Sequence, residues 1–491
     1  MAGSPEGEKK GEEIVKGGEL LFWGGSSWDT LGQKVTDASA NLVSPTRLRS
    51  LLGVNISFVA SGCASCHCVA LDVDGRCYTW GRNKKGQLGH GDTVRRDRPT
   101  VVSELLKHKI VKAGAGRNHT LVVTSDGHSF AFGENKHGQL GSGSARNGKP
   151  TIGPMRTAGL PIYGQLGHGT DHEYNAKDSS VRLAYEAQPR PRAIASLAEK
   201  AIVKVACGTN HTVAADSNGF LYTWGFGGYG RLGHREQKDE WIPRLVETFQ
   251  RQNVLPPNAI VSAGSQSSAC TAGGGQLYIW GKIKATGDDW MYPKPLLDLG
   301  GWNIRCMDSG FAHHVVGADD SCISWGQAQY GELGYGPHGQ KSSANPKKVD
   351  SLEGMHVISA ACGMGFSMII VDRENADDRL EQIAVYDGEC LSEEGADKLE
   401  SKGPDVKKPA KKKAVNSKRK KFMDDSKSEN EENEEGDANG SDKKKQRGRK
   451  VKAASGRGRG KAAGKSPTES KGSSGRGQGR VKTGKIGRPR K

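Results

Sequence analysis

Arginines separated by glycine or proline recur in the last part of this 491-residue chain. They stand in R-G-R-G-K (457–461), G-R-G-Q-G-R (475–480) and G-R-P-R-K (487–491). Small spacer residues keep the backbone narrow, so that guanidinium groups can bind phosphates and enter the minor groove of DNA. The residues that we predict to contact DNA are Arg457, Arg459, Arg476, Arg480, Arg488 and Arg490.

Lysine-rich strings precede these arginines. K-K-P-A-K-K-K (407–413) and K-R-K-K (418–421) are typical of nuclear-import signals. An acidic run at 429–437 separates them from the arginine segment. The residues that we predict to act in import are Lys411, Lys412, Lys413, Lys418, Arg419, Lys420 and Lys421.

Charge divides the chain into two parts. Residues 401–491 contain 30 basic and 11 acidic residues, whereas the remaining chain contains 42 and 44 and is nearly neutral. Because the basic part is poor in apolar residues, it cannot bury enough surface to offset the entropy of ordering, and we expect disorder. Two hypotheses remain for this tail, which are nucleic-acid binding and a purely solubilising extension.

Two motif matches have simpler explanations than cofactor binding. C-A-S-C-H at 63–67 spells a haem-attachment string, but sister repeats keep the histidine without the cysteines. G-F-G-G-Y-G at 225–230 spells a dinucleotide fingerprint, but a strand rather than a helix is expected after it. We therefore predict no metal and no cofactor, and we expect reduced cysteines.

Histidines recur at positions 119, 211 and 313, each at the same point of a repeat. A shared position favours a shared structural task, and we expect a hydrogen bond within each repeat unit. Tryptophans that precede glycine likewise recur, and we expect them to face the core. Because no catalytic constellation stands out from this background, we predict no catalytic residue and no covalent catalysis.

The recurring histidines and tryptophans must be positioned by a repeated structural unit. Short apolar runs end in an aromatic-Gly, Trp-Gly or Ala-Gly step at glycines 24, 81, 133, 159, 225, 281 and 326. Most steps lead to a string such as G-Q-L-G at 86–89 or G-R-L-G at 230–233. Spacing near fifty residues, with D-G and N-G turns between apolar runs, predicts antiparallel four-stranded units that stack radially. The expected fold is an all-β, seven-bladed β-propeller.

Repeat arithmetic also predicts how the ring closes. Residues 19–24 form only the second half of a unit, and residues 362–372 form only a first half, so together they complete one blade. The interval from Gly133 to Gly159 is only 26 residues, about 29 short of the others. We therefore expect one incomplete blade, and we favour a splice product or faulty gene model over a design with fewer strands.

The order G-x-N-H-T, D-G turn, Y-T-W-G and G-Q-L-G resembles the repeats of the regulator of chromosome condensation family, over residues 18–372. W-G-F-G-G-Y-G-R-L-G-H at 224–234 is more similar to the family's second member and its plant relatives than to the founding Ran exchange factor. The resemblance implies a seven-bladed propeller. We divide the chain into a flexible N-terminus (1–17), the propeller (18–372), a linker (373–406) and a disordered basic tail (407–491) with AT-hook-like segments.

Three functions follow from the tail and the resemblance. We expect a nuclear, chromatin-associated regulatory scaffold whose propeller binds a protein partner, such as a small GTPase or histones, and whose tail binds DNA. The alternative that the family implies is guanine-nucleotide exchange on a small GTPase. The third function is light reception, because a plant UV-B receptor shares the fold and absorbs through tryptophans in G-W-R-H-T strings. The matching strings here are G-R-N-H-T and G-T-N-H-T, which lack the tryptophan, so we do not expect this chain to be a light receptor. An N-terminus without an apolar signal segment predicts an intracellular protein that does not bind membranes.

Overall fold

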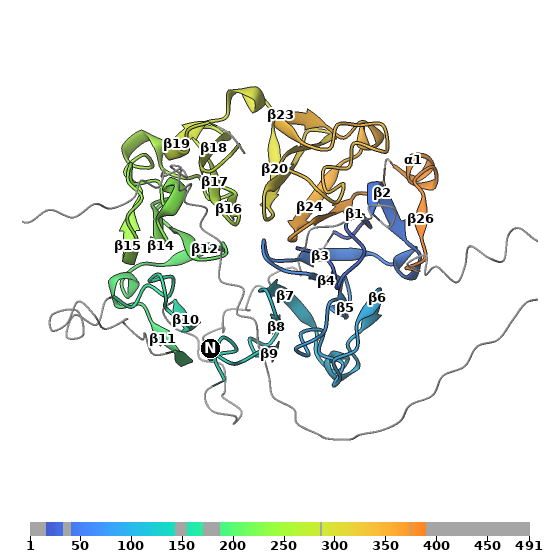
Figure 1. Cartoon of the computed structure of the whole chain (residues 1–491), viewed down its shortest axis with the longest axis horizontal. Helices are drawn as coiled ribbons and strands as arrows, with labels where there is room; N and C mark the ends of the chain where they lie inside the picture. Colours follow the sequence, from blue (N-terminus) through green and yellow to red (C-terminus); the bar gives the residue numbers. More distant parts are fainter. Residues whose placement is uncertain are drawn as a thin grey trace, which may run out of the picture. The chain divides into compact units, whose positions relative to one another are not determined.

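Antiparallel β-sheet makes up nearly all regular structure in a computed structural model that describes residues 16–32, 41–142, 155–169, 187–284, 287–374 and 376–388. Within these residues, seven sheets follow one another around a ring (Figure 1). Six of them have three or more strands and are the blades of an all-β propeller, while the seventh has two strands. The expected fold class is confirmed at this level. No helix in the described part is long and apolar enough to cross a membrane.

Four of the sheets contain four strands, which pair in chain order. The first contains β3 (Ile56–Ala60), β4 (His67–Asp72), β5 (Cys77–Gly81) and β6 (Arg96–Val101). The second contains β12 (Ile202–Cys207), β13 (His211–Asp216), β14 (Leu221–Gly225) and β15 (Glu240–Leu245). The third contains β16 (Val261–Ala263), β17 (Ser267–Ala272), β18 (Gln276–Gly281) and β19 (Trp290–Pro295). The fourth contains β20 (Ile304–Ser309), β21 (His313–Ala318), β22 (Ser321–Gly326) and β23 (Ser343–Lys348).

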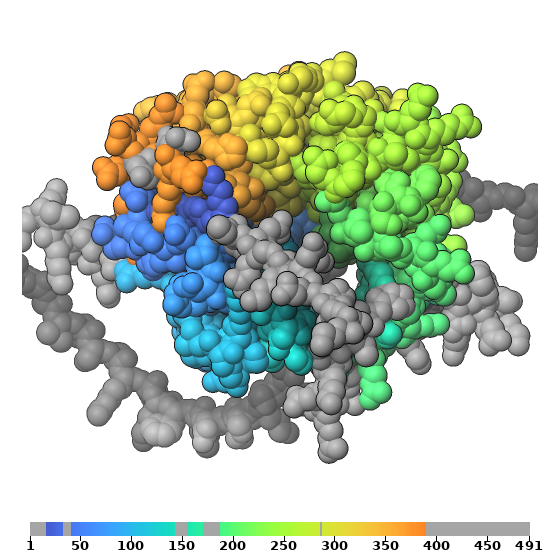
Figure 2. Space-filling view, turned by 180° about the vertical axis from the view of Figure 1, so that it is seen from behind, coloured from blue at the N-terminus to red at the C-terminus, as the bar shows by residue number. Residues whose placement is uncertain are grey.

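One sheet joins strands from both ends of the propeller sequence. Its order is β24 (Val357–Cys362), β25 (Phe366–Val371), β1 (Glu19–Gly24), β2 (Leu42–Leu48) and β26 (Val385–Tyr386). β1 pairs antiparallel with β25 along its whole length, and β26 pairs in parallel with β2 after the short helix α1 (Asp377–Glu381). Residues 377–386, which the sequence analysis placed in a linker, therefore hold a helix and a strand. Both views show this orange segment beside the blue strands (Figures 1 and 2).

Two smaller sheets flank the short interval in the repeat pattern. One contains β7 (Ile110–Ala115), β8 (His119–Thr124) and β9 (Ser129–Gly133), and the other contains β10 (Arg156–Gly159) and β11 (Gln188–Ala193). β10 leads to G-Q-L-G at 164–167 just as β5, the third strand of its sheet, leads to the same string at 86–89. The two-stranded sheet thus matches the outer half of a four-stranded one.

The apolar core lies between neighbouring sheets. At the end of the third strand of five sheets stands a tryptophan that is at most 1% exposed; these are Trp23, Trp80, Trp224, Trp280 and Trp325. Their predicted core position is confirmed. Phe132 takes the same place in β9 but is only partly buried, so the core is thinner beside the two smaller sheets.

The glycine after each tryptophan is needed because the chain turns sharply there. Gly225 has φ +106°, a region in which other residues are strained, and a Cβ atom there would lie 2.5 Å from the carbonyl oxygen of Asn210. Gly326 has φ +123°, and a Cβ atom there would lie 2.3 Å from the carbonyl oxygen of Ala312. The Trp-Gly step in the sequence therefore combines a core side chain with a close approach to the preceding strand.

Antiparallel pairing places the loops of every sheet on two opposite faces. One face, which we call the glycine-loop face, holds the connections from first to second and from third to fourth strands, including all G-x-L-G strings and the 3-10 turn η4 (Gly228–Gly230). The opposite face holds the tight turns and the 3-10 helices that lead to the next sheet. These helices are η1 (Arg49–Leu51), η2 (Ser103–Leu105), η3 (Ala195–Leu197), η5 (Arg251–Asn253), η6 (Leu297–Leu299) and η7 (Asp350–Leu352).

Candidate protein-interaction surface

Histidines at one position of the repeat link three of the sheets to the sheet that follows. The Nε2 atoms of three of them lie 2.7, 2.8 and 3.0 Å from a hydroxyl oxygen of the following sheet. Each hydroxyl donates to the main-chain carbonyl of the second residue of a G-x-L-G loop, at 2.8 Å in all three cases. We call this hydrogen-bond triple the interblade latch. Its three copies are His67–Thr120–Gln87, His211–Ser268–Arg231 and His313–Ser367–Glu332.

The latch corrects the expectation for two of the histidines that recur in the sequence, since His211 and His313 bond to the neighbouring repeat unit and not within their own. Because each hydroxyl hydrogen is used on the carbonyl, the ring must donate from Nε2. Burial lowers the pKa of His67 to about 3 and that of His313 to about 4. Both rings are therefore neutral near pH 7 and hold the blades together as hydrogen-bond donors.

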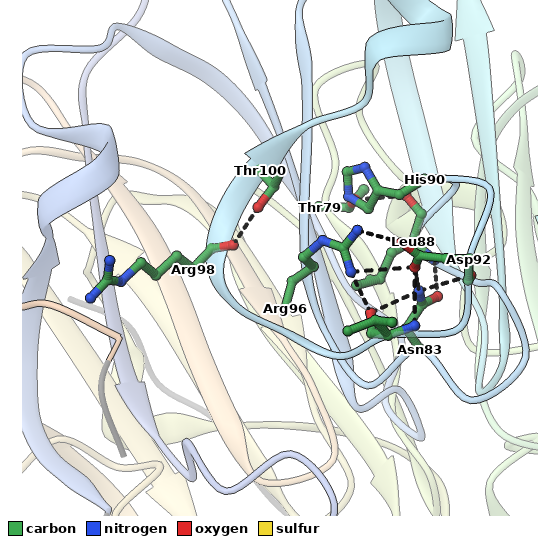
Figure 3. A network of polar contacts seen from close by, with 9 residues as sticks. Thr79, Asn83, Leu88, His90, Asp92, Arg96, Arg98 and Thr100 are labelled. Carbon is green, nitrogen blue, oxygen red and sulfur yellow. Dashed lines mark hydrogen bonds and ion pairs between the residues drawn. The ribbon is translucent and has the colours of Figure 1, made fainter. Parts of the chain in front are cut away.

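The loop between β5 and β6 shows how polar contacts hold a G-x-L-G string in place (Figure 3). Thr79 donates its hydroxyl hydrogen to the Leu88 carbonyl at 2.7 Å and lies 3.0 Å from Nε2 of His90. The Asn83 side chain accepts from the Leu88 amide and donates to the main chain of Asp92. Arg96 forms an ion pair with Asp92 at 2.7 Å. The same threonine-to-carbonyl bond recurs at Thr157 and Thr223, so one contact fixes the loop in three sheets.

The loop after β14 carries a cluster of cations and aromatic rings, which we call the Tyr229 cluster. The Arg231 guanidinium lies 4.6 Å from the ring centre of Phe226 and 5.4 Å from that of Tyr229. The Lys282 ammonium lies 4.9 Å from the Tyr229 ring centre. Arg231 is buried, and it donates to the carbonyl oxygen of Ser265 at 2.6 Å and to that of Gly228 at 3.0 Å. Cation–π contacts of this kind hold the rings in place.

Tyr229 adopts a backbone conformation that non-glycine residues rarely take. Its φ is +61°, inside the turn η4. A tyrosine there costs about 1 kcal/mol or more relative to glycine, and such costs persist where the side chain has a task. The half-buried ring is thus held at the surface by the turn and by two cations.

A pocket of about 320 Å³ opens beside this cluster, between the β16–β19 and β20–β23 sheets. Phe311 and Ile283 supply apolar surface, and Lys282 and Lys284 supply positive charge. The remaining wall includes amide and hydroxyl groups of Gln266, Gln327, Ser267, Ser342 and Ser343. An apolar floor with cationic and hydrogen-bonding rims suits an acidic peptide segment of a protein partner.

The two faces differ in charge. Among the described side chains in the strand-connecting segments, the glycine-loop face has 12 basic and 8 acidic residues, and the opposite face has 9 basic and 15 acidic residues. The glycine-loop face therefore has a net positive charge, and the opposite face has a net negative charge. The net charge of the whole ring is near zero, so this difference appears only when the two faces are counted separately.

The residues predicted from sequence fall into two groups. All predicted DNA-binding arginines and import lysines, from Lys411 to Arg490, lie outside the described residues. The string at 63–67 is described, and its side chains have separate partners: Cys63 lies 3.5 Å from the Thr209 hydroxyl, and His67 belongs to a latch. In 225–230, the turn η4 is followed by the strand β15. Among described residues, no group of three or more ligands has metal-binding geometry.

Sequence reasoning missed the Tyr229 cluster, although a signal was present. The second position of G-x-L-G is glutamine or glutamate in four other copies and arginine only in G-R-L-G at 230–233. The residue before the string is tyrosine in three of the five copies, at Tyr163, Tyr229 and Tyr330, so the tyrosine itself is shared. The arginine at the second position is therefore the signal in the sequence that distinguishes this copy from its sisters.

Comparisons with known proteins agree with the repeat pattern. The Regulator of chromosome condensation (RCC1) repeat matches residues 74–123, 157–215, 218–271 and 319–370, and a second profile of this repeat matches 56–87, 110–139 and 202–231. Human Protein RCC2 is 37% identical over 425 residues, which cover 76% of this chain and 80% of the human protein. Ultraviolet-B receptor UVR8 of Arabidopsis thaliana is 27% identical over 356 residues, which cover 70% of this chain and 69% of the receptor.

A solved structure supports the fold. Prp20p from Saccharomyces cerevisiae, described with its binding properties to Gsp1p and histones, superposes with a TM-score of 0.57 at 20% identity, over 75% of this chain and 95% of Prp20p. The predicted resemblance to the family's second member is confirmed by the match to Protein RCC2. From its repeats, its propeller and its relatives, the chain belongs to the Regulator of chromosome condensation (RCC1) repeat family.

Proposed function

We propose that this RCC1-family protein is a nuclear, chromatin-associated regulatory scaffold, in which the propeller binds a protein partner and the basic tail binds DNA. The observation that carries the first half is the Tyr229 cluster beside a lysine-rimmed pocket on the glycine-loop face. Loops held by hydrogen bonds and a strained aromatic residue at the surface are suited to recognition of a partner. An acidic segment of a regulatory protein is the partner that fits this face.

The tail supports the second half of the proposal through its composition. Residues 401–491 carry 30 basic and 11 acidic residues, which favours attraction to DNA through release of counterions. Lys411 to Lys421 would direct the chain to the nucleus, and the glycine-spaced arginines would enter the minor groove. The propeller would then bring its protein partner to chromatin.

We also infer that the ring has seven blade positions and is closed by half-blades from both ends. The two-stranded sheet β10–β11 corresponds to the outer half of a seventh blade, because β10 precedes a G-Q-L-G string as third strands do. The pairing of β1 with β25 would act as the closure that resists opening of the ring. Residues 143–154 lie where the sequence is short by about 29 residues.

Guanine-nucleotide exchange on a small GTPase is the second candidate. Prp20p, which shares the fold, binds Gsp1p and histones, and an exchange factor needs only a binding face and no bond-making residues. Histones would instead suit the acidic face opposite the glycine loops, because they are basic. Release of a fluorescent guanine nucleotide from candidate GTPases, with and without the full chain, separates exchange from scaffolding.

Substitution of surface lysines tests the partner-binding half. The full chain with Lys282→Glu and Lys284→Glu is compared with a matched control, Lys107→Glu and Lys109→Glu, on the opposite face. In affinity purification from nuclear extract, we expect the first pair to lose its bound proteins and the control to keep them. Equal recovery by both variants would assign partner binding to another surface.

Substitution of the six tail arginines tests the DNA-binding half. Alanine at all six sites removes charge and groove insertion together, whereas lysine keeps the charge and loses the flat guanidinium. We expect affinity to fall with alanine and to persist with lysine, while any A·T preference is lost with lysine. If the alanine variant binds DNA as tightly as the unchanged chain, the tail is not the DNA-binding region.

A further inference from the structure

Among the described residues, no strand lies beside the inner edge of β10, although its place in the repeat is that of an interior strand. Every four-stranded sheet places two strands inside its third strand; within the described residues, β10 pairs only with β11 on its outer side. The free N–H and C=O groups of such an edge are a template for another β-strand. The empty place lies between the β7–β9 sheet and the β12–β15 sheet.

Both walls of this place expose apolar side chains that sister repeats bury. On β8, Leu121 and Val123 are 37% and 38% exposed, whereas Val213, the equivalent of Leu121 on β13, is fully buried against the next sheet. Val122 between them packs against the β3–β6 sheet, so its two neighbours face the opposite way, toward β10.

The opposite wall belongs to β12. Val203 and Val205 are 59% and 54% exposed. Val205 pairs with Ala214, which packs against the β10–β11 side, so Val205 faces that side too. Its equivalent in β3, Val59, is 4% exposed because a neighbouring sheet covers it. The four side chains thus form two apolar walls on either side of the place that two inner strands occupy in sister sheets.

Polar groups at the same place lack the partner that their sisters have. In each interblade latch, a threonine or serine of the next sheet joins a histidine ring to a G-x-L-G carbonyl. Among described residues, the His119 ring and the Gln139 carbonyl, which would form the latch here, make no such bond. The missing component is therefore one hydroxyl group at a defined point of an inner strand.

For the case that the short interval is that of a splice product, we propose that this open sector binds an antiparallel β-hairpin from a partner protein, with apolar residues alternating along its strands and a Thr or Ser opposite His119. The hairpin strand next to β10 completes its hydrogen-bond ladder, a mode known as β-augmentation. Its apolar residues cover Leu121 and Val205, and its hydroxyl joins His119 to Gln139.

Chain length favours an occupant from outside over the adjacent segment. Residues 143–154 number twelve and must also connect Ser142 to Met155. Two six-residue strands would use all twelve and leave none for the turn between them, whereas the inner strands of sister sheets are mostly six residues long. A second copy of the chain, and residues 170–186, are the other occupants that the test must distinguish.

The test uses the full chain and a fluorescent peptide that copies residues 201–217, with Cys207→Ser. This peptide contains an inner hairpin of the chain itself, with Thr212 at the position of the latch hydroxyl. We expect saturable binding by anisotropy, and slowed amide exchange of Arg156–Gly159 on binding. Val205→Asp in the full chain, with the peptide unchanged, should weaken peptide binding more than about tenfold, since it buries a charge. Leu297→Asp in the full chain, on the opposite face, is the matched control.

The hydroxyl distinguishes a specific site from a generally sticky edge. The Thr212→Val peptide should bind the unchanged protein about fivefold more weakly than the unmodified peptide does, which is the value of one hydrogen bond. The His119→Ala protein, which lacks the latch histidine, should bind the two peptides equally well. If Thr212→Val weakens peptide binding equally for the unchanged protein and for the His119→Ala protein, the assignment of the peptide hydroxyl to His119 is wrong. Slow exchange at Arg156–Gly159 without peptide would show that the chain fills its own sector, and a dimer that Val205→Asp dissociates would show a second copy there.

Discussion

Buried histidines should make the stability of the propeller fall as the pH falls. Burial lowers the pKa of His313 to about 4, whereas a histidine of the unfolded chain titrates near 6.5. Between these values the unfolded state binds a proton that the folded state does not, so the stabilisation is complete above about pH 6.5 and is lost as the pH falls toward 4. The loss is about 1.4 kcal/mol for each pH unit, so the contribution of His313 to the free energy of unfolding is about 2 kcal/mol smaller at pH 5.0 than above pH 6.5.

The substitution His313→Gln isolates this contribution. The glutamine amide can still donate to Ser367 but does not titrate. Urea unfolding gives the free energy of unfolding of both proteins at pH 7.5 and 5.0. We expect the substitution to destabilise the protein at pH 7.5 and the penalty to be about 2 kcal/mol smaller at pH 5.0.

Other titrating groups cancel in this comparison. Burial raises the pKa of Asp308 to about 7, which changes stability in the opposite sense over the same window, but it does so in both proteins. His338→Gln, in an exposed loop, controls for removal of a histidine that the fold does not bury. A His313→Gln penalty that is equal at the two pH values would refute the neutral, buried latch.

Three further predictions concern the ring and the tail. Deletion of residues 1–25 removes β1 from β25 and should sharply lower the melting temperature; an unchanged value would refute closure by these strands. Amide exchange should be faster in Arg156–Gly159 than in His211–Asp216, because an open edge lacks partners; equal protection in the protein alone would contradict an open sector. If the tail engages about 6–10 phosphates, DNA affinity should fall by about 10³- to 10⁵-fold between 50 and 200 mM salt; a flat salt dependence would exclude binding by charge.

The repeat pattern predicted the propeller because its signals are local. A Trp-Gly step couples a core side chain to a turn that only glycine adopts without strain, so Trp224 and Gly225 could be assigned from two adjacent letters. The G-x-L-G strings likewise marked where third strands end. The strand β26 escaped prediction because it has two residues and owes its pairing to β2, more than 300 residues earlier.

The candidate site was harder to predict because its contacts join different repeats. His211 and Ser268 stand 57 residues apart, and nothing in the spacing of either one indicates that they meet. Lys282 reaches the Tyr229 ring from the following sheet for the same reason. Sequence periodicity defines which residues share a position within a unit, whereas recognition depends on what lies across the boundary between units.

Arg231 connects the latch to the Tyr229 cluster, and this has a mechanical consequence. Its carbonyl oxygen accepts from Ser268, which in turn holds His211, while its guanidinium packs against Phe226 and Tyr229. A partner that presses on the Tyr229 ring therefore acts on the residue whose main chain joins two blades. Because hydrogen bonds to the carbonyl oxygens of Gly228 and Ser265 hold that guanidinium in place, we infer that binding at the glycine-loop face is coupled to cohesion of the β12–β15 and β16–β19 sheets.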